Sequence, residues 1–319
     1  MDLESLLERA GAARRSGEAL FFAPSFKHYE SPHFDAGRGD GLAAVSATGS
    51  TCALGCDHCG GALLDRMEAA VTPGDLVAIA RRLAGRGAGG MLVSGGSEPG
   101  GSVPLLPYVD AMAEARGLGL EVVVHTGLVT EALAEGLARA GVACAMLDVV
   151  GDEHTIRSVC HLDASPGDIE RSLLLLESRS VRTVPHVVVG LDHGRIRGER
   201  EALDLVSRTG PSAVVIVVLD PIPGTPMQDV EPPAPEEVAS IMAAARLAFP
   251  RIPVALGCAR PPGPHRAATD RYALMAGLDA IAFPADSTVA LARSMGLEPR
   301  FHRTCCSMAV DLAGPRDRH

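Results

Sequence analysis

Eight short apolar runs, rich in Val and Ile, constrain the fold of this chain more than any other feature. They cover residues 43–48, 91–94, 121–126, 144–150, 183–191, 213–220, 253–257 and 280–284. Short continuous runs of this kind are typical of strands buried on both faces of a parallel sheet. Each is followed by a stretch with a helical pattern, at 72–86, 103–117, 130–140, 168–178, 197–209, 235–249, 267–276 and 287–295. The alternation predicts a (β/α)8 barrel of the TIM type, complete or partly open, in preference to a doubly wound sheet.

Two segments flank the predicted barrel, which we place at residues 42–296. The N-terminal extension, 1–41, begins with Leu3, Leu6, Leu7 and Ala10 at the spacing of a short amphipathic helix. Residues 21–41 show no regular pattern, and they would either close the bottom of the barrel or contact a partner. The C-terminal tail, 297–319, carries a pair of adjacent cysteines.

Composition narrows the class of protein. The chain has 319 residues, 47% hydrophobic and 21% charged, which is ordinary for a soluble enzyme. Its net charge of −10 argues against a nucleic-acid partner. No secretory signal pattern opens the chain, and no apolar run is long enough for a membrane span. Its eight cysteines therefore indicate a reducing, cytoplasmic location in which thiols are available for metal.

Three of those cysteines follow the first apolar run. Cys52, Cys56 and Cys59 have the spacing C-x3-C-x2-C, so one short loop presents three thiolates. A closed structural zinc site needs four ligands, whereas three thiolates suit a 4Fe–4S cluster with one open iron. Because loops after barrel strands lie at the carboxyl-terminal mouth, this loop is predicted to lie at the active site.

The three-cysteine loop resembles that of the radical S-adenosylmethionine (SAM) superfamily. The resemblance implies that the open iron binds SAM, and that the reduced cluster cleaves SAM to a 5′-deoxyadenosyl radical. His58 stands where the superfamily usually has an aromatic residue, and an imidazole can still pack on an adenine edge.

Several other residues match segments that bind SAM in this superfamily. Gly95, Gly96 and Ser97, with Glu98 displaced by one position, resemble the motif that holds the methionyl ammonium. Gly190 lies in a segment resembling the adenine-contact region, and Pro221 opens a Pro-Gly-Thr-Pro-containing turn found in the biotin synthase-like branch.

Two polar residues near strand ends are further cofactor-binding candidates. His125 either faces the cavity or is a hydrogen-bonded core histidine. Asp148 either accepts from the ribose hydroxyls of SAM or caps a helix.

A second group of thiols comes from distant parts of the chain. Cys258 follows the seventh run, and Cys305 and Cys306 lie in the tail. If the tail folds over the mouth, these three can hold an auxiliary 4Fe–4S cluster and serve as the catalytic sulfur source. Its fourth ligand would be Ser307, Cys160 or water. The alternative is that Cys258 is a small buried hydrophobe and the tail pair is incidental. Cys144, inside an apolar run, is expected in the core.

The whole pattern resembles the biotin synthase-like branch, and within it the two-protein lipoyl synthases. The segments that carry the resemblance are 53–61, 125–127, 185–191, 256–261 and 305–307. It implies a radical SAM sulfurtransferase of lipoate biosynthesis, which adds sulfur to a protein-bound octanoyl chain. The implied partners are an octanoylated lipoyl-carrier protein, a paralogous synthase component and a ferredoxin or flavodoxin. Neither nucleic acid nor membrane is an expected partner.

Two other functions stay open at this point. One is a biotin synthase-like mutase or metal-cofactor maturase with a single 4Fe–4S cluster. The other is a non-catalytic protein that binds an iron–sulfur cluster or zinc.

Overall fold

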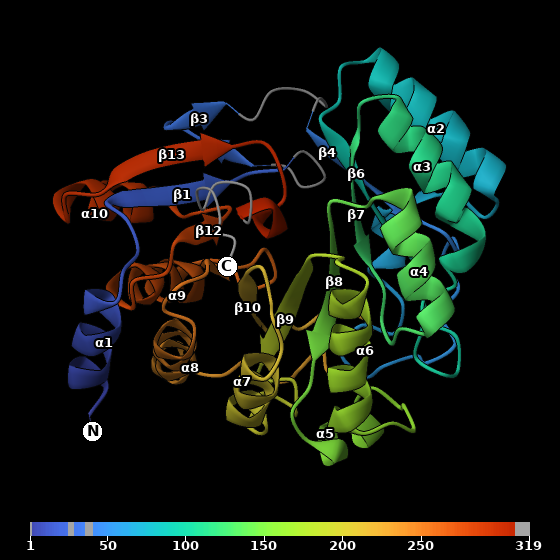
Figure 1. The fold of residues 1–319 in the computed structure, drawn as a ribbon. Helices are drawn as coiled ribbons and strands as arrows, with labels where there is room; N and C mark the ends of the chain where they lie inside the picture. The colour runs from blue at the N-terminus through green and yellow to red at the C-terminus, as the bar shows by residue number, and fades with distance from the viewer. Residues whose placement is uncertain (1, 25–28, 36–40, 310–319) are drawn as a thin grey trace.

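The fold is built on one curled sheet of eleven parallel strands (Figure 1). The computed structural model describes residues 2–24, 29–35 and 41–309. The strand order is β13-β1-β12-β11-β10-β9-β8-β7-β6-β4-β5, and a separate antiparallel pair joins β2 (Glu30–Ser31) to β3 (Phe34–Asp35). Among the described residues the two edge strands, β13 and β5, do not pair, so the barrel is partly open.

All eight predicted barrel strands are confirmed. They are β4 (Leu42–Ser46), β6 (Gly90–Ser94), β7 (Glu121–His125), β8 (Cys144–Val149), β9 (Thr183–Val189), β10 (Val214–Val218), β11 (Val254–Leu256) and β12 (Ala280–Ala282). Each pairs in parallel with the next, as the βα alternation requires. The loops after these strands therefore meet at one mouth.

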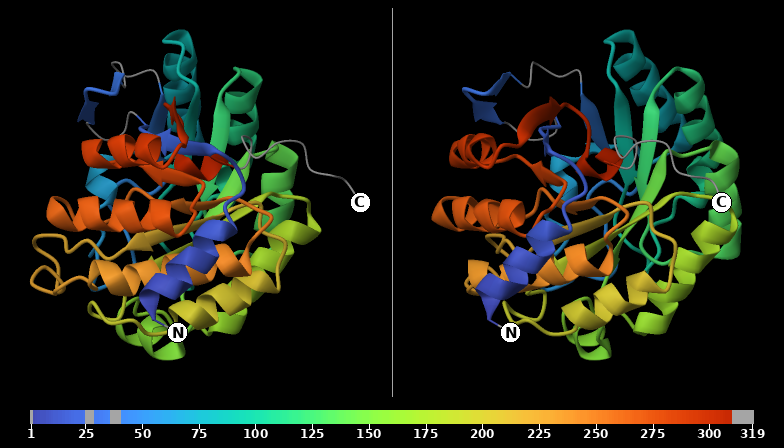
Figure 2. Two further views of the ribbon diagram at one scale, coloured as in Figure 1. Left: turned by 90° about the vertical axis from the view of Figure 1, so that its left-hand side faces the viewer. Right: turned by 60° about the vertical axis from the view of Figure 1, so that its left-hand side comes forward.

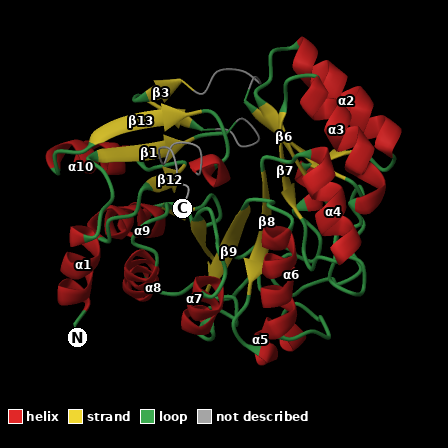
Figure 3. Cartoon of the chain, in the orientation of Figure 1, coloured by secondary structure: helices red, strands yellow, loops and turns green. Residues whose placement is uncertain are grey.

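The predicted helices are also present and cover the convex face of the sheet (Figures 2 and 3). They are α2 (Pro73–Gly85), α3 (Val109–Gly117), α4 (Glu131–Ala140), α6 (Pro166–Ser178), α7 (Glu199–Ser207), α8 (Pro235–Ala248), α9 (Pro264–Met275) and α10 (Asp286–Ser294). At the start of α2, the Thr72 side chain accepts from the Asp75 N–H and the Asp75 carboxylate accepts from the Thr72 N–H. The opening helix, α1 (Leu3–Ala12), packs on α8 and α9. No helix in the described ranges is long and apolar enough to span a membrane.

Three strands of the main sheet and one helix were absent from the sequence prediction. β1 (Glu18–Phe22) lies between β12 and β13 (Glu298–His302) and pairs in parallel with both. The irregular segment predicted from residue 21 thus begins inside a strand, while 25–28 and 36–40 lie outside the described residues. A short helix, α5 (Glu153–Ser158), follows β8, and β5 (Glu68–Ala69) extends the opposite edge. The predicted divisions at 41/42 and 296/297 stay predictions, although strands from both flanking segments join the central sheet.

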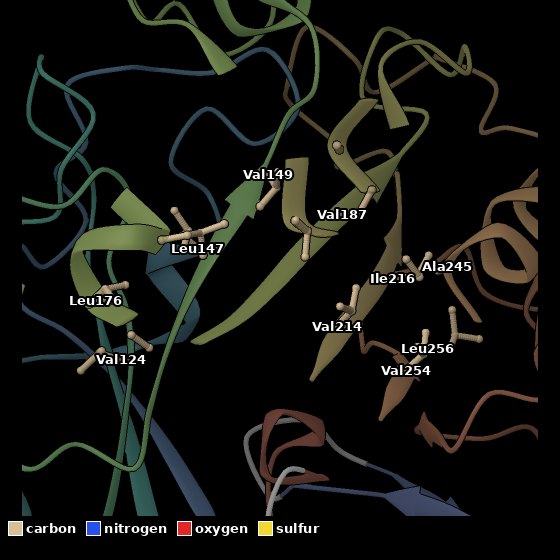
Figure 4. Packing of buried hydrophobic residues seen from close by; sticks show 14 of the residues in the cluster. Val124, Leu147, Val149, Leu176, Val187, Val214, Ile216, Ala245, Val254 and Leu256 are labelled. Atoms are coloured by element: carbon tan, nitrogen blue, oxygen red, sulfur yellow. The ribbon is translucent and has the colours of Figure 1, made fainter. Parts of the chain in front are cut away.

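The two faces of the sheet have separate cores. Alternate side chains from the strands, such as Leu147, Val187 and Ile216, pack against the helices on the convex side (Figure 4). The intervening residues, including Val123, Met146 and Val184, point to the concave side. There they pack against the turn η3 (Cys306–Met308), which contacts β8, β11 and β12 from inside the curl (Figure 1).

Candidate active site

The loop that carries the first three cysteines is tied to the loop after the neighbouring strand. This Cys loop, residues 47–63, follows β4. The Ala47 N–H donates to Ser94 O at 2.7 Å, and the Ala53 N–H donates to Ser97 O at 2.8 Å. In the other direction the Gly96 N–H donates to Thr48 Oγ1 at 2.7 Å. The Gly-rich segment predicted to hold the SAM ammonium therefore forms one wall of the Cys loop.

Gly96 lies where a side chain has no space. A Cβ added to it would stand 2.0 Å from Thr51 O and 2.6 Å from the Cys52 Cβ. Only glycine lets the two loops approach this closely, so Gly96 sets the position of Cys52.

The segment around Cys160 crosses the Cys loop on its far side and also forms hydrogen bonds with it. The Asp57 N–H donates to Val159 O at 2.9 Å, and the Cys56 thiol donates to Cys160 O at 3.3 Å. His161 reaches Leu54 O with Nδ1 at 3.2 Å and Asp57 Oδ1 with Nε2 at 3.1 Å. Cys160 thus lies beside the Cys loop, and its suggested role as a ligand to the tail cysteines stays a prediction.

Two histidines around Asp57 adopt a backbone conformation that is unusual for them. His161 has φ 54° and His193 has φ 49°, and His193 Nε2 lies 4.0 Å from Asp57 Oδ2. Left-handed backbone at non-glycine residues is often found at functional sites. Here it lets both imidazoles reach one carboxylate in the middle of the Cys loop.

The three thiols fit a cluster by chemistry and position. The Cys56 and Cys59 side chains are in hydrogen-bond contact, and Cys52 lies within electrostatic range of Cys56. Contact with Cys160 raises the pKa of Cys56 to about 12, and contact with Cys56 raises the pKa of Cys59 to about 12. Binding iron as thiolates therefore requires these thiols to release their protons. In the described part of the chain no three His, Cys, Asp or Glu groups form a compact single-ion site.

One polar atom at this place also lacks a partner. Nδ1 of His58 is buried and makes no hydrogen bond among the described residues. It lies beside Cys59 and within electrostatic range of Asp148. A buried nitrogen without a hydrogen-bond partner, next to three cysteines, is compatible with a polar ligand such as SAM. The residues present therefore fit both an iron–sulfur cluster and SAM.

Three polar residues on the concave face, His125, Asp148 and His186, lie next to this loop. Asp148 of β8 is directly opposite His186 of β9, and His125 Nε2 lies 3.6 Å from Asp148 Oδ1. The Asp148 side chain is 49% exposed although strands flank it on both sides, so it faces the open interior. The protein that surrounds this interior desolvates the carboxylate and opposes its ionisation, yet the neighbouring His125 outweighs that effect and lowers the pKa of Asp148 to about 2. His125 therefore faces the interior as the first sequence alternative proposed, and its pKa is raised because Asp148 outweighs burial.

His186 was not a candidate from the sequence. Burial, together with the neighbouring His125, lowers its pKa to about 4, so its imidazole is neutral at pH 7. The only sequence signal was a histidine at an inward position of an apolar strand.

The tail cysteines lie on the same concave face. Cys305 and Cys306 are buried, their thiols are in hydrogen-bond contact, and Cys258 packs on the same cluster. The Cys306 contact lowers the pKa of Cys305, to which His125 also contributes. The folding-over of the tail and the grouping of Cys258 with the pair agree with the sequence expectation. The Ser307 hydroxyl is buried beside them without a hydrogen-bond partner in the described ranges.

The remaining cofactor-binding candidates have other contacts. The Glu98 carboxylate, on an exposed residue, accepts from Ser102 Oγ at 3.4 Å. The Gly190 N–H donates to Glu199 Oε1 at 2.8 Å, so that donor is already used. Pro221 lies in the loop after β10, and a Cβ added to Gly95 would stand 3.1 Å from Thr48 Oγ1. Their roles toward SAM stay predictions.

Comparisons with known proteins agree with this geometry. No family model matches the chain. It is 31% identical to biotin synthase of Halorhodospira halophila over 249 residues, which is 72% of this chain and 71% of that protein. Its fold matches methylornithine synthase (TM-score 0.64, 14% identity), over 98% of this chain and 92% of that one. It also matches the FeFe-hydrogenase maturase of Carboxydothermus hydrogenoformans (TM-score 0.63, 13% identity), over 94% and 71%.

A curled parallel sheet with three cysteines after its first barrel strand is the arrangement expected of a radical SAM enzyme. The likeness to a curated relative narrows the class further, because it extends over two thirds of both chains. The chain belongs to the biotin synthase-like family of that superfamily.

Proposed function

We propose that this protein inserts sulfur at unactivated carbons, as one component of a two-protein lipoyl synthase. The observation that carries the proposal is the second group of thiols, Cys258, Cys305 and Cys306, gathered on the concave face. Asp148 and His125 stand between this group and the Cys loop, because Asp148 interacts with His58 and His125 interacts with Cys305. Electrostatic contacts through these two residues therefore connect the two groups of cysteines.

Each of the two groups of cysteines would supply a different part of the sulfur-insertion reaction. When bound at the Cys loop, a cluster with SAM supplies hydrogen-atom abstraction, which an unactivated C–H bond requires. Cys258, Cys305 and Cys306 would hold the sulfur source on the other side of the interior. Apolar residues around the tail pair, such as Met146, Val217 and Phe283, suit an alkyl chain such as a protein-bound octanoyl group. A paralogous component and a ferredoxin or flavodoxin would complete the system.

Iron counting tests the proposal directly. After anaerobic reconstitution we expect about eight irons per chain in the wild type. About four should remain in the Cys52→Ala/Cys56→Ala/Cys59→Ala variant, and about four in Cys305→Ala/Cys306→Ala. The matched control is Cys144→Ala, a buried cysteine on the same concave face that should keep the wild-type count. With octanoylated carrier protein and the paralogue present, mass spectrometry should detect sulfur addition. The tail variant should still cleave SAM but add no sulfur.

The second candidate is a biotin synthase-like mutase or cofactor maturase with one cluster. The fold matches to methylornithine synthase and to a hydrogenase maturase are compatible with it. About four irons in the wild type, falling to none without the Cys loop, would favour this candidate and remove the sulfur source.

A further inference from the structure

A small, partly open cavity lies behind the loops that follow β8 and β9. Its walls come from the carboxyl ends of these strands and from the starts of α5 and α7. The space available to the centre of a water-sized sphere is about 10 Å³, enough for one such species. The cavity is separate from the two groups of cysteines, and the proposed function makes no use of it.

Three oxygen atoms at this cavity lack hydrogen-bond partners among the described residues. They are Glu199 Oε2, Thr155 Oγ1 and Asp152 Oδ2. Glu199 is 3% exposed and Thr155 is 1% exposed, and both line the cavity. Asp152 Oδ2 lies at its edge, since it is 2.7 Å from the position of a Cβ added to Gly198, another lining residue. Buried oxygens without partners are costly, so their presence together indicates a missing ligand.

The other oxygen of each carboxylate is already used. Glu199 Oε1 accepts from the Gly190 N–H at 2.8 Å. Asp152 Oδ1 accepts from the Thr155 N–H at 3.0 Å and from Arg197 Nε at 3.1 Å. These bonds fix both carboxylates in place and leave Oδ2 and Oε2 without a hydrogen-bond partner among the described residues.

The net charge of the residues around the cavity indicates whether the missing ligand is a cation or a water molecule. Two carboxylates and one guanidinium, that of Arg197, leave one negative charge in excess near the cavity. Burial raises the pKa of Glu199, and the nearby Asp152 adds to the shift. Burial opposes the ionisation of Asp152, but hydrogen bonds from the Thr155 N–H and from Arg197 outweigh it and lower the pKa of this carboxyl. A water molecule would satisfy the oxygens but leave the charge, whereas a single positive charge would balance it.

We propose that Asp152, Thr155 and Glu199 bind one small monovalent cation of about the size of Na⁺. Two carboxylate oxygens and a hydroxyl are hard ligands, which suit a hard cation. The ion would join the loop after β8 to the start of α7 and, through Glu199, to Gly190 at the end of β9. It would thereby stabilise the strand ends that border the interior without touching the reacting atoms.

The first test is the unfolding midpoint of the full-length protein, loaded with its iron–sulfur centres and measured by calorimetry. At constant ionic strength, choline chloride is replaced by NaCl, KCl, MgCl₂ or CaCl₂. We expect NaCl to raise the midpoint by about 2–4 °C over choline chloride. Glu199→Gln, which keeps an oxygen for the Gly190 N–H, and Thr155→Val should both lose this difference. The control is Glu201→Gln, an exposed position on the same helix, which should respond as the wild type does.

The second measurement avoids unfolding. ²³Na relaxation in the presence of wild-type protein should show bound ion, and Glu199→Gln should abolish that signal. Several results would overturn the site: no difference between Na⁺ and choline, an equal response to every salt, or a Na⁺ response that persists in Glu199→Gln. A response to Mg²⁺ or Ca²⁺ alone would overturn the monovalent assignment. None of these results depends on the number of iron–sulfur clusters.

Discussion

Gly96 is the residue on which the position of the Cys loop most depends. Its amide is held by Thr48, and its missing side chain leaves room for Cys52. A single methyl group at this position would collide with backbone as well as side-chain atoms, and neither can move without displacing the loop.

Replacing Gly96 by Ala should therefore damage iron binding more than folding. The added Cβ would stand 2.0 Å from Thr51 O, so the Cys loop must shift. We expect the iron content after anaerobic reconstitution to fall below half of the wild-type value, with little change in far-UV circular dichroism. Gly100→Ala is the matched control, because a Cβ on Gly100 meets nothing within 4 Å. Equal iron contents in the two variants would contradict this role for Gly96.

For individual residues, the sequence predicted those parts of the site that are close together in the chain. The spacing of Cys52, Cys56 and Cys59 specifies a three-thiol loop without any tertiary information. The approach of His125, Asp148 and His186 depends instead on the register of three strands, which residue patterns do not encode. Asp152 and Glu199 come together for the same reason, from two loops that are adjacent only in the folded sheet.

Among the elements, β11, β12 and α9 are joined by one buried side chain. Arg260, which follows β11, is fully buried. It donates to Asp270 at 2.8 Å, to Gly257 O at 2.6 Å and to Ala282 O at 2.7 Å. Its guanidinium is thus a structural tie rather than a group that contacts substrate.

Arg260→Met should destabilise the protein by about 3–5 kcal/mol, because it leaves the buried Asp270 carboxylate without its counter-charge. Urea unfolding of the apoprotein measures the change in free energy. Arg81→Met serves as the comparison, since it removes an exposed ion pair with Glu114 and should cost less than about 1 kcal/mol. Similar losses in the two variants would show that Arg260 does not make this connection.

The strands β1 and β13 were not predicted from the sequence for a common reason. β13 reads Glu-Pro-Arg-Phe-His, which lacks the apolar run of an interior strand, and β1 precedes the first βα unit. Their pairing joins segments about 280 residues apart, from Glu18 with Glu298 to Phe22 with His302. Local periodicity predicts that a strand exists only when burial imposes a pattern, and it does not predict the distant partner.

In the whole molecule, the two ends of the chain complete both the sheet and the concave core. β13 covers one side of β1, and the segment Cys305–Ala309 packs on the inner faces of the strands. A chain that ends after Leu297 would expose β1 as an edge strand and would uncover apolar interior residues.

Deletion of residues 298–319 should therefore lower stability by more than about 3 kcal/mol and promote association. Urea unfolding and light scattering measure the two effects. The full-length Cys305→Ser/Cys306→Ser variant separates loss of the thiols from loss of the strand, and it should stay monodisperse. A truncated chain that unfolds at the wild-type urea concentration would contradict this account.

The pairing of β1 with β12 and β13 also sets the order in which the molecule can be completed during its synthesis. Among the strands of the sheet β1 is made before all others, whereas its two neighbours, β12 and β13, follow every other strand. A strand without a partner for most of translation is exposed to wrong pairing, and non-local pairing of this kind is slow. The segment 305–309, which covers the concave face, follows every one of these strands in the chain. The interior can therefore close only after all the strands around it have been made.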